Sequence, residues 1–99
     1  MTEEGRIKKE ICDYLSLHPH RCLFTMPPRG GMGNYTSRYL QRGWPDITGL
    51  WDSVPLFIEV KTPKGKLSKE QIDFFTKAQR FNCIALIARD VQHVMDVLK

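Results

Sequence analysis

The 99-residue sequence lacks the features of membrane proteins and of repeat proteins. No run approaches the roughly 18 apolar residues that a membrane-spanning helix needs, and no apolar signal core follows the first methionine. Internal repeats, linkers and low-complexity segments are also missing. We therefore expect a single domain that spans residues 1–99, is soluble and resides in the cytoplasm.

Cysteine is scarce, and the sequence has no Cys-x-x-Cys or His-x-x-x-His pattern that would indicate a zinc site. The three cysteines, Cys12, Cys22 and Cys83, are odd in number, widely spaced and flanked by apolar residues. This usage favours buried, reduced thiols over disulfides, which suits a cytosolic protein.

Acidic residues are absent from two stretches, 27–45 and 61–69, although the whole chain carries 11 of them against 15 lysines and arginines. The net charge of +4 and the pI near 9.1 are compatible with a polyanionic partner, but many proteins that bind none share them. The candidate DNA-backbone contacts in these stretches are Arg29, Arg38, Arg42, Lys64, Lys66 and Lys69. A solvated loop or face is the alternative at both places.

Apolar spacing and turn residues predict three helices and four strands in the order αβββαβα around a small mixed sheet. The expected elements are a helix over 3–17, strands over 22–26, 46–51 and 56–61, a helix after Ser68, a strand over 83–88 and a helix after Asp90. The strand over 83–88 is almost entirely apolar, so we expect it to be fully buried.

Two helix signals are specific. In the first helix, Ile7, Ile11 and Leu15 recur every fourth residue, so one stripe faces a core. The segment Ser68-Lys69-Glu70-Gln71 has the form of a capping box, and the expected buried face of its helix runs through Ile72 and Phe75.

The irregular stretch from residue 27 to residue 45 is long for so small a domain, and such loops are usually functional or disordered. Its glycines at positions 30, 31 and 33 invite a phosphate-loop interpretation, but no Lys-Ser or Lys-Thr pair follows them. The better functional hypothesis is a loop that contacts a DNA backbone and stacks on exposed bases. A merely solvated loop is the alternative.

The most informative residues are the pair Pro45-Asp46 and the run Glu59-Val60-Lys61. Alternation along a strand places the side chains of Glu59 and Lys61 on one face, and a hairpin brings Asp46 near Glu59. Two carboxylates and a strand carbonyl are hard oxygen ligands that suit Mg²⁺ or Mn²⁺. The alternative is a surface strand with an ordinary Glu–Lys pair.

These motifs resemble those of the virus-type replication-repair nuclease (VRR-NUC) domains, a branch of the PD-(D/E)XK nucleases. The run from Arg42 to Gly49 is similar to the first family motif, and the run from Phe57 to Gln71 is similar to the second. Asn82 departs from the family, in which many members have a glycine there. The resemblance implies a restriction-endonuclease-like α/β fold and metal-dependent cleavage of DNA.

The resemblance also implies a role for each of six residues. The metal ligands would be the carboxylates of Asp46 and Glu59 and the carbonyl of Val60. Lys61 would be the catalytic lysine, Gln71 would steady that lysine or the attacking water, and Glu10 would be an outer-shell or second-metal ligand. For Gln71, capping of the helix is a second role that is compatible with the first.

Short, stand-alone members of this family resemble dimeric enzymes that act on four-way junctions, whereas larger relatives favour flaps. The resemblance therefore implies a homodimer that cleaves branched DNA, in the setting of phage or viral replication and repair and thus in the cytoplasm of a host cell. The alternatives are a flap or duplex nuclease, a non-catalytic DNA-binding module of the same fold, and a protein-interaction domain within a larger assembly.

Overall fold

The computed structural model describes residues 1–27 and 41–99. In chain order its elements are α1 (Glu3–Ser16), β1 (Cys22–Thr25), β2 (Ile47–Trp51), β3 (Val54–Val60), α2 (Lys69–Ala78), β4 (Ile84–Ala88) and α3 (Val91–Val97). This order confirms the predicted αβββαβα arrangement. Within the described ranges, no helix is long and apolar enough to cross a membrane.

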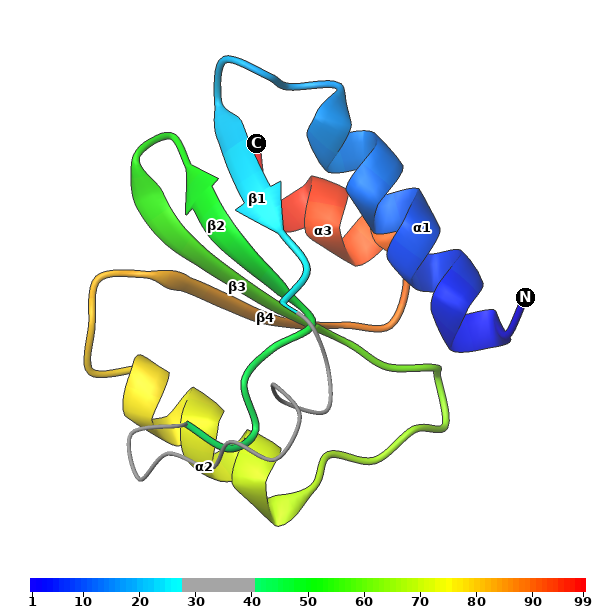
Figure 1. Cartoon of the computed structure of the whole chain (residues 1–99), viewed down its shortest axis with the longest axis vertical. Helices are drawn as coiled ribbons and strands as arrows, with labels where there is room; N and C mark the ends of the chain where they lie inside the picture. Colours follow the sequence, from blue (N-terminus) through cyan, green and yellow to red (C-terminus); the bar gives the residue numbers. More distant parts are fainter. Residues whose placement is uncertain (28–40) are drawn as a thin grey trace.

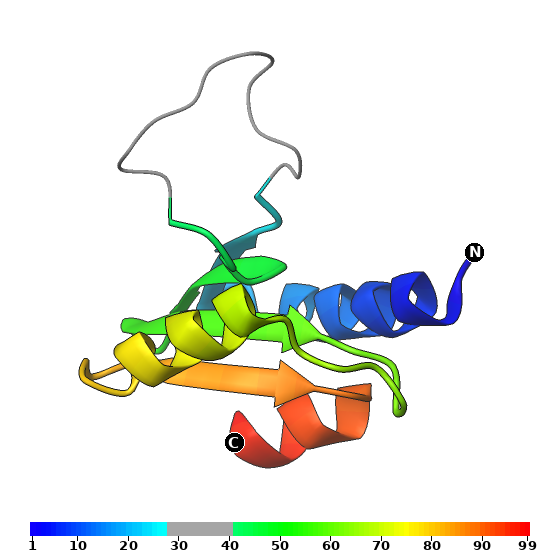
Figure 2. The same ribbon diagram turned by 90° about the horizontal axis from the view of Figure 1, so that it is seen from below.

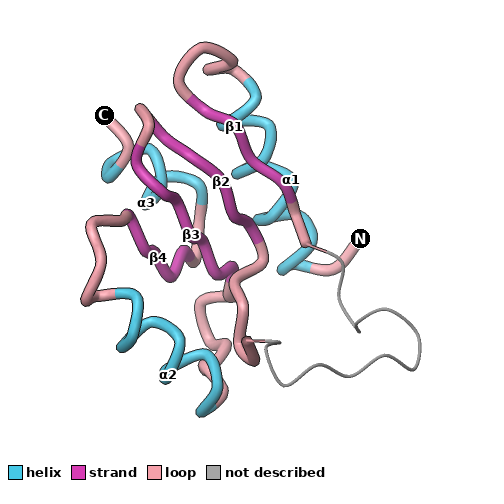
Figure 3. The backbone as a smooth tube through the Cα atoms, turned by 60° about the vertical axis from the view of Figure 1, so that its left-hand side comes forward, coloured by secondary structure: helices cyan, strands magenta, loops and turns pink. Residues whose placement is uncertain are grey.

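The four strands form one mixed sheet in the order β1-β2-β3-β4 (Figure 3). Antiparallel pairing joins β1 to β2 and β2 to β3, and parallel pairing joins β3 to β4 through the crossover that contains α2. Helices α1 and α3 lie on one side of the sheet and α2 lies on the other (Figures 1 and 2). The molecule therefore has three layers, with strand β3 in the interior of the sheet.

The larger core lies between the sheet and the pair α1 and α3. The predicted stripe on α1 is confirmed, because Ile7, Ile11 and Leu15 are all buried. Alternate residues of β3 point into the same core, and the remaining members come from β2, β4, α3 and Leu98, the residue after α3. Glu59 is therefore left on the opposite face of the sheet, which is the face that α2 covers.

The smaller core lies beneath α2, where Phe74, Phe75 and Ala78 pack against Phe57 and β4. The expected buried face of this helix was wrong in part, because Ile72 is 51% exposed. The helix is rotated so that Phe74 and Ala78 face the sheet, and residues three and four apart share a helical face. This rotation also turns Gln71 toward β3.

The prediction that the strand over 83–88 is fully buried was also wrong. Only Leu86 and Ala88 are buried in β4. The reason is topological, since β4 is at the edge of the sheet and pairs with β3 alone. An apolar run predicts a buried strand, but its position in the sheet decides how much of it is covered.

The turn between β2 and β3 consists of Asp52 and Ser53, whose φ angles are 51° and 69°. Two positive φ values are typical of the tight hairpin turns whose twist matches that of the strands. Arg21 forms two hydrogen bonds with the carboxylate of Asp52, at 2.9 and 2.7 Å, and this contact lowers the pKa of Asp52. The tight turn fixes the register of the hairpin that carries Asp46 and Glu59.

The three cysteines are free thiols, but the predicted burial was wrong, because each has intermediate exposure. Burial raises the pKa of the thiols of Cys12 and Cys22 above the ordinary value. These two thiols therefore stay protonated at neutral pH and act as small packing groups.

Gly49, at the centre of β2, permits the close approach of β1. A Cβ atom at this position would lie 2.0 Å from the carbonyl oxygen of Leu23 and 2.6 Å from the Cα of Phe24. Both of these atoms belong to the backbone, so they cannot rotate away as a flexible side chain would.

We predict that Gly49→Ala destabilises the fold by about 2 kcal/mol or more, because the added methyl group must push β1 away from β2. Urea unfolding followed by circular dichroism measures this change. The control is Leu50→Ala on the same strand, where the side chain is 41% exposed and the expected loss is less than about 1 kcal/mol. Equal stability of the two variants would contradict the close-approach argument.

Candidate active site

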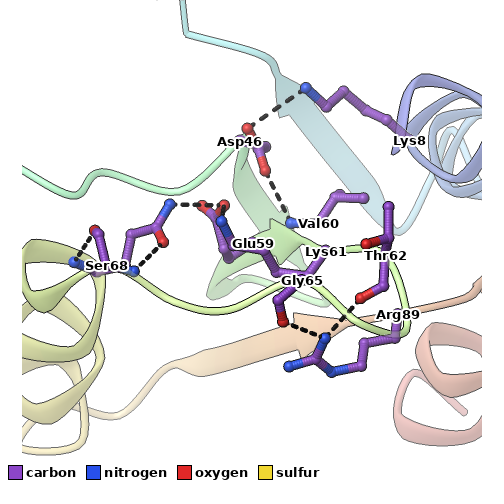
Figure 4. Close-up of polar contacts among 10 residues, drawn as sticks. Lys8, Asp46, Glu59, Val60, Lys61, Thr62, Gly65, Ser68 and Arg89 are labelled. Atoms are coloured by element: carbon purple, nitrogen blue, oxygen red, sulfur yellow. Dashed lines mark hydrogen bonds and ion pairs between the residues drawn. The ribbon is translucent and has the colours of Figure 1, made fainter. Parts of the chain in front are cut away.

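The β2–β3 hairpin brings the two predicted acids together. Ile47, the first residue of β2, pairs with Ile58 of β3, so Asp46 directly precedes the paired part of β2 and Glu59 directly follows Ile58. Neighbouring strands lie about 5 Å apart, and both acids are at the same end of the hairpin (Figure 4). Both acids are removed from solvent, with exposures of 6% for Asp46 and 1% for Glu59.

Asp46 is held from two directions (Figure 4). Its Oδ2 atom accepts a hydrogen bond from the backbone N–H of Val60 at 2.8 Å, and its Oδ1 atom lies 3.4 Å from the ammonium of Lys8 on α1. The first contact joins the start of β2 to the end of β3. The second connects the carboxylate to the helix on the far side of the sheet.

Glu59 is contacted by residues from the other side of the site. Its Oε2 atom accepts a hydrogen bond from the side-chain amide of Gln71 at 3.0 Å and lies 3.8 Å from the ammonium of Lys61. The predicted residues Asp46, Glu59, Lys61 and Gln71 therefore gather in one place. A buried carboxylate requires such partners, because it has lost the hydration that stabilises its charge in water.

Gln71 has two contacts at once, as the sequence allowed. Its side-chain carbonyl accepts from the backbone N–H of Ser68 at 2.9 Å, and its backbone N–H donates to the Ser68 hydroxyl at 3.1 Å. This is the predicted capping box at the start of α2. The amide nitrogen of the same side chain is the donor to Glu59, so the helix cap and the site share one residue.

The segment that precedes Asp46 is fixed against α2. Gly43 has a φ of +76°, and a Cβ atom there would lie 2.3 Å from the carbonyl oxygen of Glu70, so only glycine fits both the angle and the space. The ring of Trp44 lies edge-on to Phe57 and Phe74, with centroid distances of 5.5 and 5.1 Å. These contacts set the direction in which the chain enters the hairpin at Asp46.

Arg89 holds the loop that follows Lys61 (Figure 4). One guanidinium nitrogen donates to the carbonyl oxygens of Thr62 at 2.6 Å and Gly65 at 2.7 Å, with a longer contact to Pro63 at 3.4 Å. The backbone N–H of Lys61 also donates to Ala88 at 3.0 Å. The chain directly after β3 is thus fixed to β4 and the residue that follows it, through the backbone of Lys61 and the side chain of Arg89.

Glu10 is placed differently from the other predicted acids. Its side chain is 43% exposed and accepts a hydrogen bond from Arg6, one turn earlier on α1, at 2.6 Å. A helix advances about 100° per residue, so Glu10 and Lys8 lie on opposite flanks of the buried stripe. The acid that shares a helical face with Lys8 is Glu4, four residues before it. The role expected for Glu10 stays a prediction.

The predicted DNA contacts are only partly within the described residues. Lys64, Lys66 and Lys69 are exposed on and after the loop held by Arg89, and Arg42 is exposed before the hairpin. Arg29 and Arg38 lie outside the described residues.

Lys8 and Arg89 were missed by the sequence argument, which considered each motif separately. A signal for Lys8 was present, because it is three residues before Ile11 and thus borders the buried stripe of α1. Arg89 directly follows β4, but nothing local in the sequence indicates that its partners are carbonyl oxygens in residues 62–65.

The donor set can be compared with what a divalent metal requires. Among residues 1–27 and 41–99, no group of three or more His, Cys, Asp and Glu side chains could hold a metal ion. The site instead offers two buried carboxylates, which is a donor set that fits Mg²⁺, since this ion is commonly held by one or two carboxylates, waters and substrate phosphates. A zinc-like set of nitrogen and sulfur ligands does not fit here.

Solved structures share this fold. One described as "VRR_NUC domain" has a TM-score of 0.73 and 19% sequence identity, and the match covers 98% of this chain and 95% of that one. Another, described as "VRR_NUC domain protein", has a TM-score of 0.68 and 15% identity over 98% of this chain and 85% of that one. The comparison with curated proteins found no match. The fold class, an α/β domain with a mixed sheet flanked by helices, is thereby confirmed.

The family model described as "VRR-NUC domain" matches residues 9–92. The chain therefore belongs to the VRR-NUC family, as its motifs indicated. It is a nuclease-type, DNA-processing domain.

The double contact of Gln71 gives a test of its importance for the site. In Gln71→Glu the new carboxylate still accepts from Ser68, so the cap is kept, but the donor to Glu59 is replaced by a like charge. We predict a loss of about 2 kcal/mol in the free energy of unfolding, since hydrogen bonds to charged groups contribute about 1.5–3 kcal/mol. Urea unfolding at neutral pH measures the loss.

Ser68→Ala is the matched control, because it removes the cap and leaves the contact with Glu59. Its expected loss is about 1 kcal/mol. If Gln71→Glu proved as stable as the wild type, the amide–carboxylate bond would contribute nothing to the fold.

Proposed function

We propose that this chain is a metal-dependent endonuclease that hydrolyses phosphodiester bonds in branched DNA, above all in four-way junctions, and acts as a homodimer. The proposal rests on one observation, which is that four predicted site residues lie together at one end of the hairpin. Asp46 and Glu59 are buried there, with Lys61 and Gln71 in contact with Glu59. Buried acids with matched cations are typical of catalytic sites.

Mg²⁺ or Mn²⁺ is the proposed cofactor, with Asp46, Glu59 and the carbonyl of Val60 as ligands and Glu10 as an outer-shell or second-metal ligand. When bound, such an ion lowers the pKa of a water ligand and stabilises the charge on a phosphate. The hydrogen bond from Val60 fixes the orientation of Asp46, and the amide of Gln71 fixes that of Glu59.

Lys61 supplies the positive charge that the reaction needs beside the metal ligands. Its ammonium is held near Glu59, and its side chain is only 16% exposed. At that depth a fixed charge interacts more strongly with the developing charge of a phosphodiester than it would in water. Arg89, by holding the loop after Lys61, keeps this lysine in position.

DNA is the proposed partner, and its backbone would meet the exposed lysines Lys64, Lys66 and Lys69 and the arginines Arg29, Arg38 and Arg42. Paired cuts on opposed strands of a junction require two sites related by symmetry, which a twofold dimer supplies. Exposed apolar side chains on the paired positions Leu23 and Leu50 support a partner surface on β1 and β2. Sedimentation of the free protein tests the dimer directly.

We predict that Lys61→Ala lowers the cleavage rate by about 100-fold or more, since removing one charge-stabilising donor costs 10²–10³ in other enzymes. DNA affinity should change little, because metal and backbone contacts remain. The assay incubates labelled four-way junction, flap and linear duplex with Mg²⁺, Mn²⁺ or EDTA and separates the products on a denaturing gel.

Lys64→Ala is the control for Lys61→Ala, because this side chain is exposed in the same loop. It should weaken DNA binding and leave the rate at saturating DNA nearly unchanged. Cleavage by Lys61→Ala at the wild-type rate would remove the lysine from the mechanism. If the wild type binds the junction and cuts none of the three DNAs, the non-catalytic binding module replaces the nuclease proposal.

We predict that Asp46→Asn weakens Mn²⁺ binding by more than about 100-fold, since even changes beyond the ligands themselves cost 10–100-fold in other metal sites. The asparagine carbonyl can still accept from Val60, so the hairpin should stay intact. Isothermal titration calorimetry measures the affinity, and thermal unfolding checks the fold. Wild-type Mn²⁺ affinity in this variant would refute the ligand assignment.

A further inference from the structure

Lys8 is a charged residue that the nuclease motifs do not include. Its ammonium lies 3.4 Å from Oδ1 of Asp46, and the two side chains are 23% and 2% exposed. The backbone of Lys8 is fixed, because its neighbour Ile7 is buried in the larger core and α1 packs there along its length. The ammonium, at the end of a flexible four-carbon stem, is free to move while its Cα is not.

The position of Lys8 conflicts with that of a divalent cation bound to Asp46. Both are positive and both are attracted to the same carboxylate, so each weakens the binding of the other at short range. The hydrogen bond from Val60 already occupies Oδ2, and Lys8 lies at Oδ1. A metal that binds Asp46 must therefore displace the ammonium or bind against its repulsion.

We propose that Lys8 is a positioning residue that couples metal binding to DNA binding. In the free protein it neutralises Asp46. When a metal ion binds Asp46, the ammonium of Lys8 moves away from that carboxylate and contacts a phosphate of the bound DNA backbone. The inference depends on the proposed function, since it requires a metal at Asp46.

Two consequences separate this role from plain charge balance. Without DNA, Lys8 opposes the metal, so removing it should strengthen metal binding. With DNA, Lys8 gains a phosphate partner only after the metal has displaced it, so each ligand strengthens the binding of the other. Coupling of this kind is reciprocal by thermodynamic necessity and is commonly 5–150-fold in size.

The test compares Lys8→Met with Lys9→Met. Lys9 is the next residue on α1, but its partner is the exposed Asp13 at 2.6 Å, on another face of the helix. Calorimetry measures Mn²⁺ affinity without DNA. Fluorescence anisotropy then measures the affinity for a labelled four-way junction in Mn²⁺ and in EDTA, with Lys61→Ala added to every protein so that the DNA stays intact.

We expect Lys8→Met to bind Mn²⁺ about tenfold more tightly in the absence of DNA, and to lose most of the gain in junction affinity that Mn²⁺ gives the parent protein. Lys9→Met should match the parent in both measurements. If Lys8→Met does not fold, Lys8→Gln gives the same comparison, because it removes the charge and keeps a hydrogen-bond donor near Asp46.

Unchanged Mn²⁺ affinity in the Lys8 variants would overturn the proposal. Tighter Mn²⁺ binding with unchanged coupling to DNA would overturn it too, since Lys8 would then only balance the charge of Asp46. Failure of the proposed function has a different signature, in which the parent protein shows no Mn²⁺ binding that depends on Asp46.

Discussion

Two carboxylates buried side by side are the constraint around which this molecule is arranged. Like charges that lie close together repel one another, and burial removes the water that would screen them. The fold places partners on three sides of these carboxylates: Lys8 on α1, Lys61 directly after β3, and Gln71 on α2. Each layer of the domain therefore supplies a partner to one of the two carboxylates. Because Lys8 and Gln71 are on helices, the packing of α1 and α2 on the sheet positions the site.

The sequence predicted whatever depends on neighbours along the chain. The element order, the buried stripe on α1, the capping box at Ser68 and the alternation in β3 were all confirmed, because each follows from spacing within one segment. The gathering of Asp46 and Glu59 followed from the hairpin, whose ends are also close in sequence. The family was recognised on the same motifs.

The predictions that were wrong, and the residues that were missed, involve contacts between segments far apart in sequence. The exposure of Ile72 depends on how α2 is rotated over the sheet, and the partial exposure of β4 depends on its place at the edge. Lys8 and Arg89 act on residues 38 and about 25 positions away, where no periodicity in the sequence connects them. The roles of the site residues, the metal cofactor and the DNA partner stay predictions.

The short turn at Asp52 and Ser53 has a consequence for the order of folding. A two-residue hairpin closes a small loop and forms within microseconds, whereas the parallel pairing of β3 with β4 must wait for the crossover that contains α2. We therefore expect the hairpin to bring Asp46 and Glu59 together before α1 and α2 dock. In that state the two acids lack the partners that the helices supply, and docking of α1 and α2 adds Lys8 and Gln71 beside them.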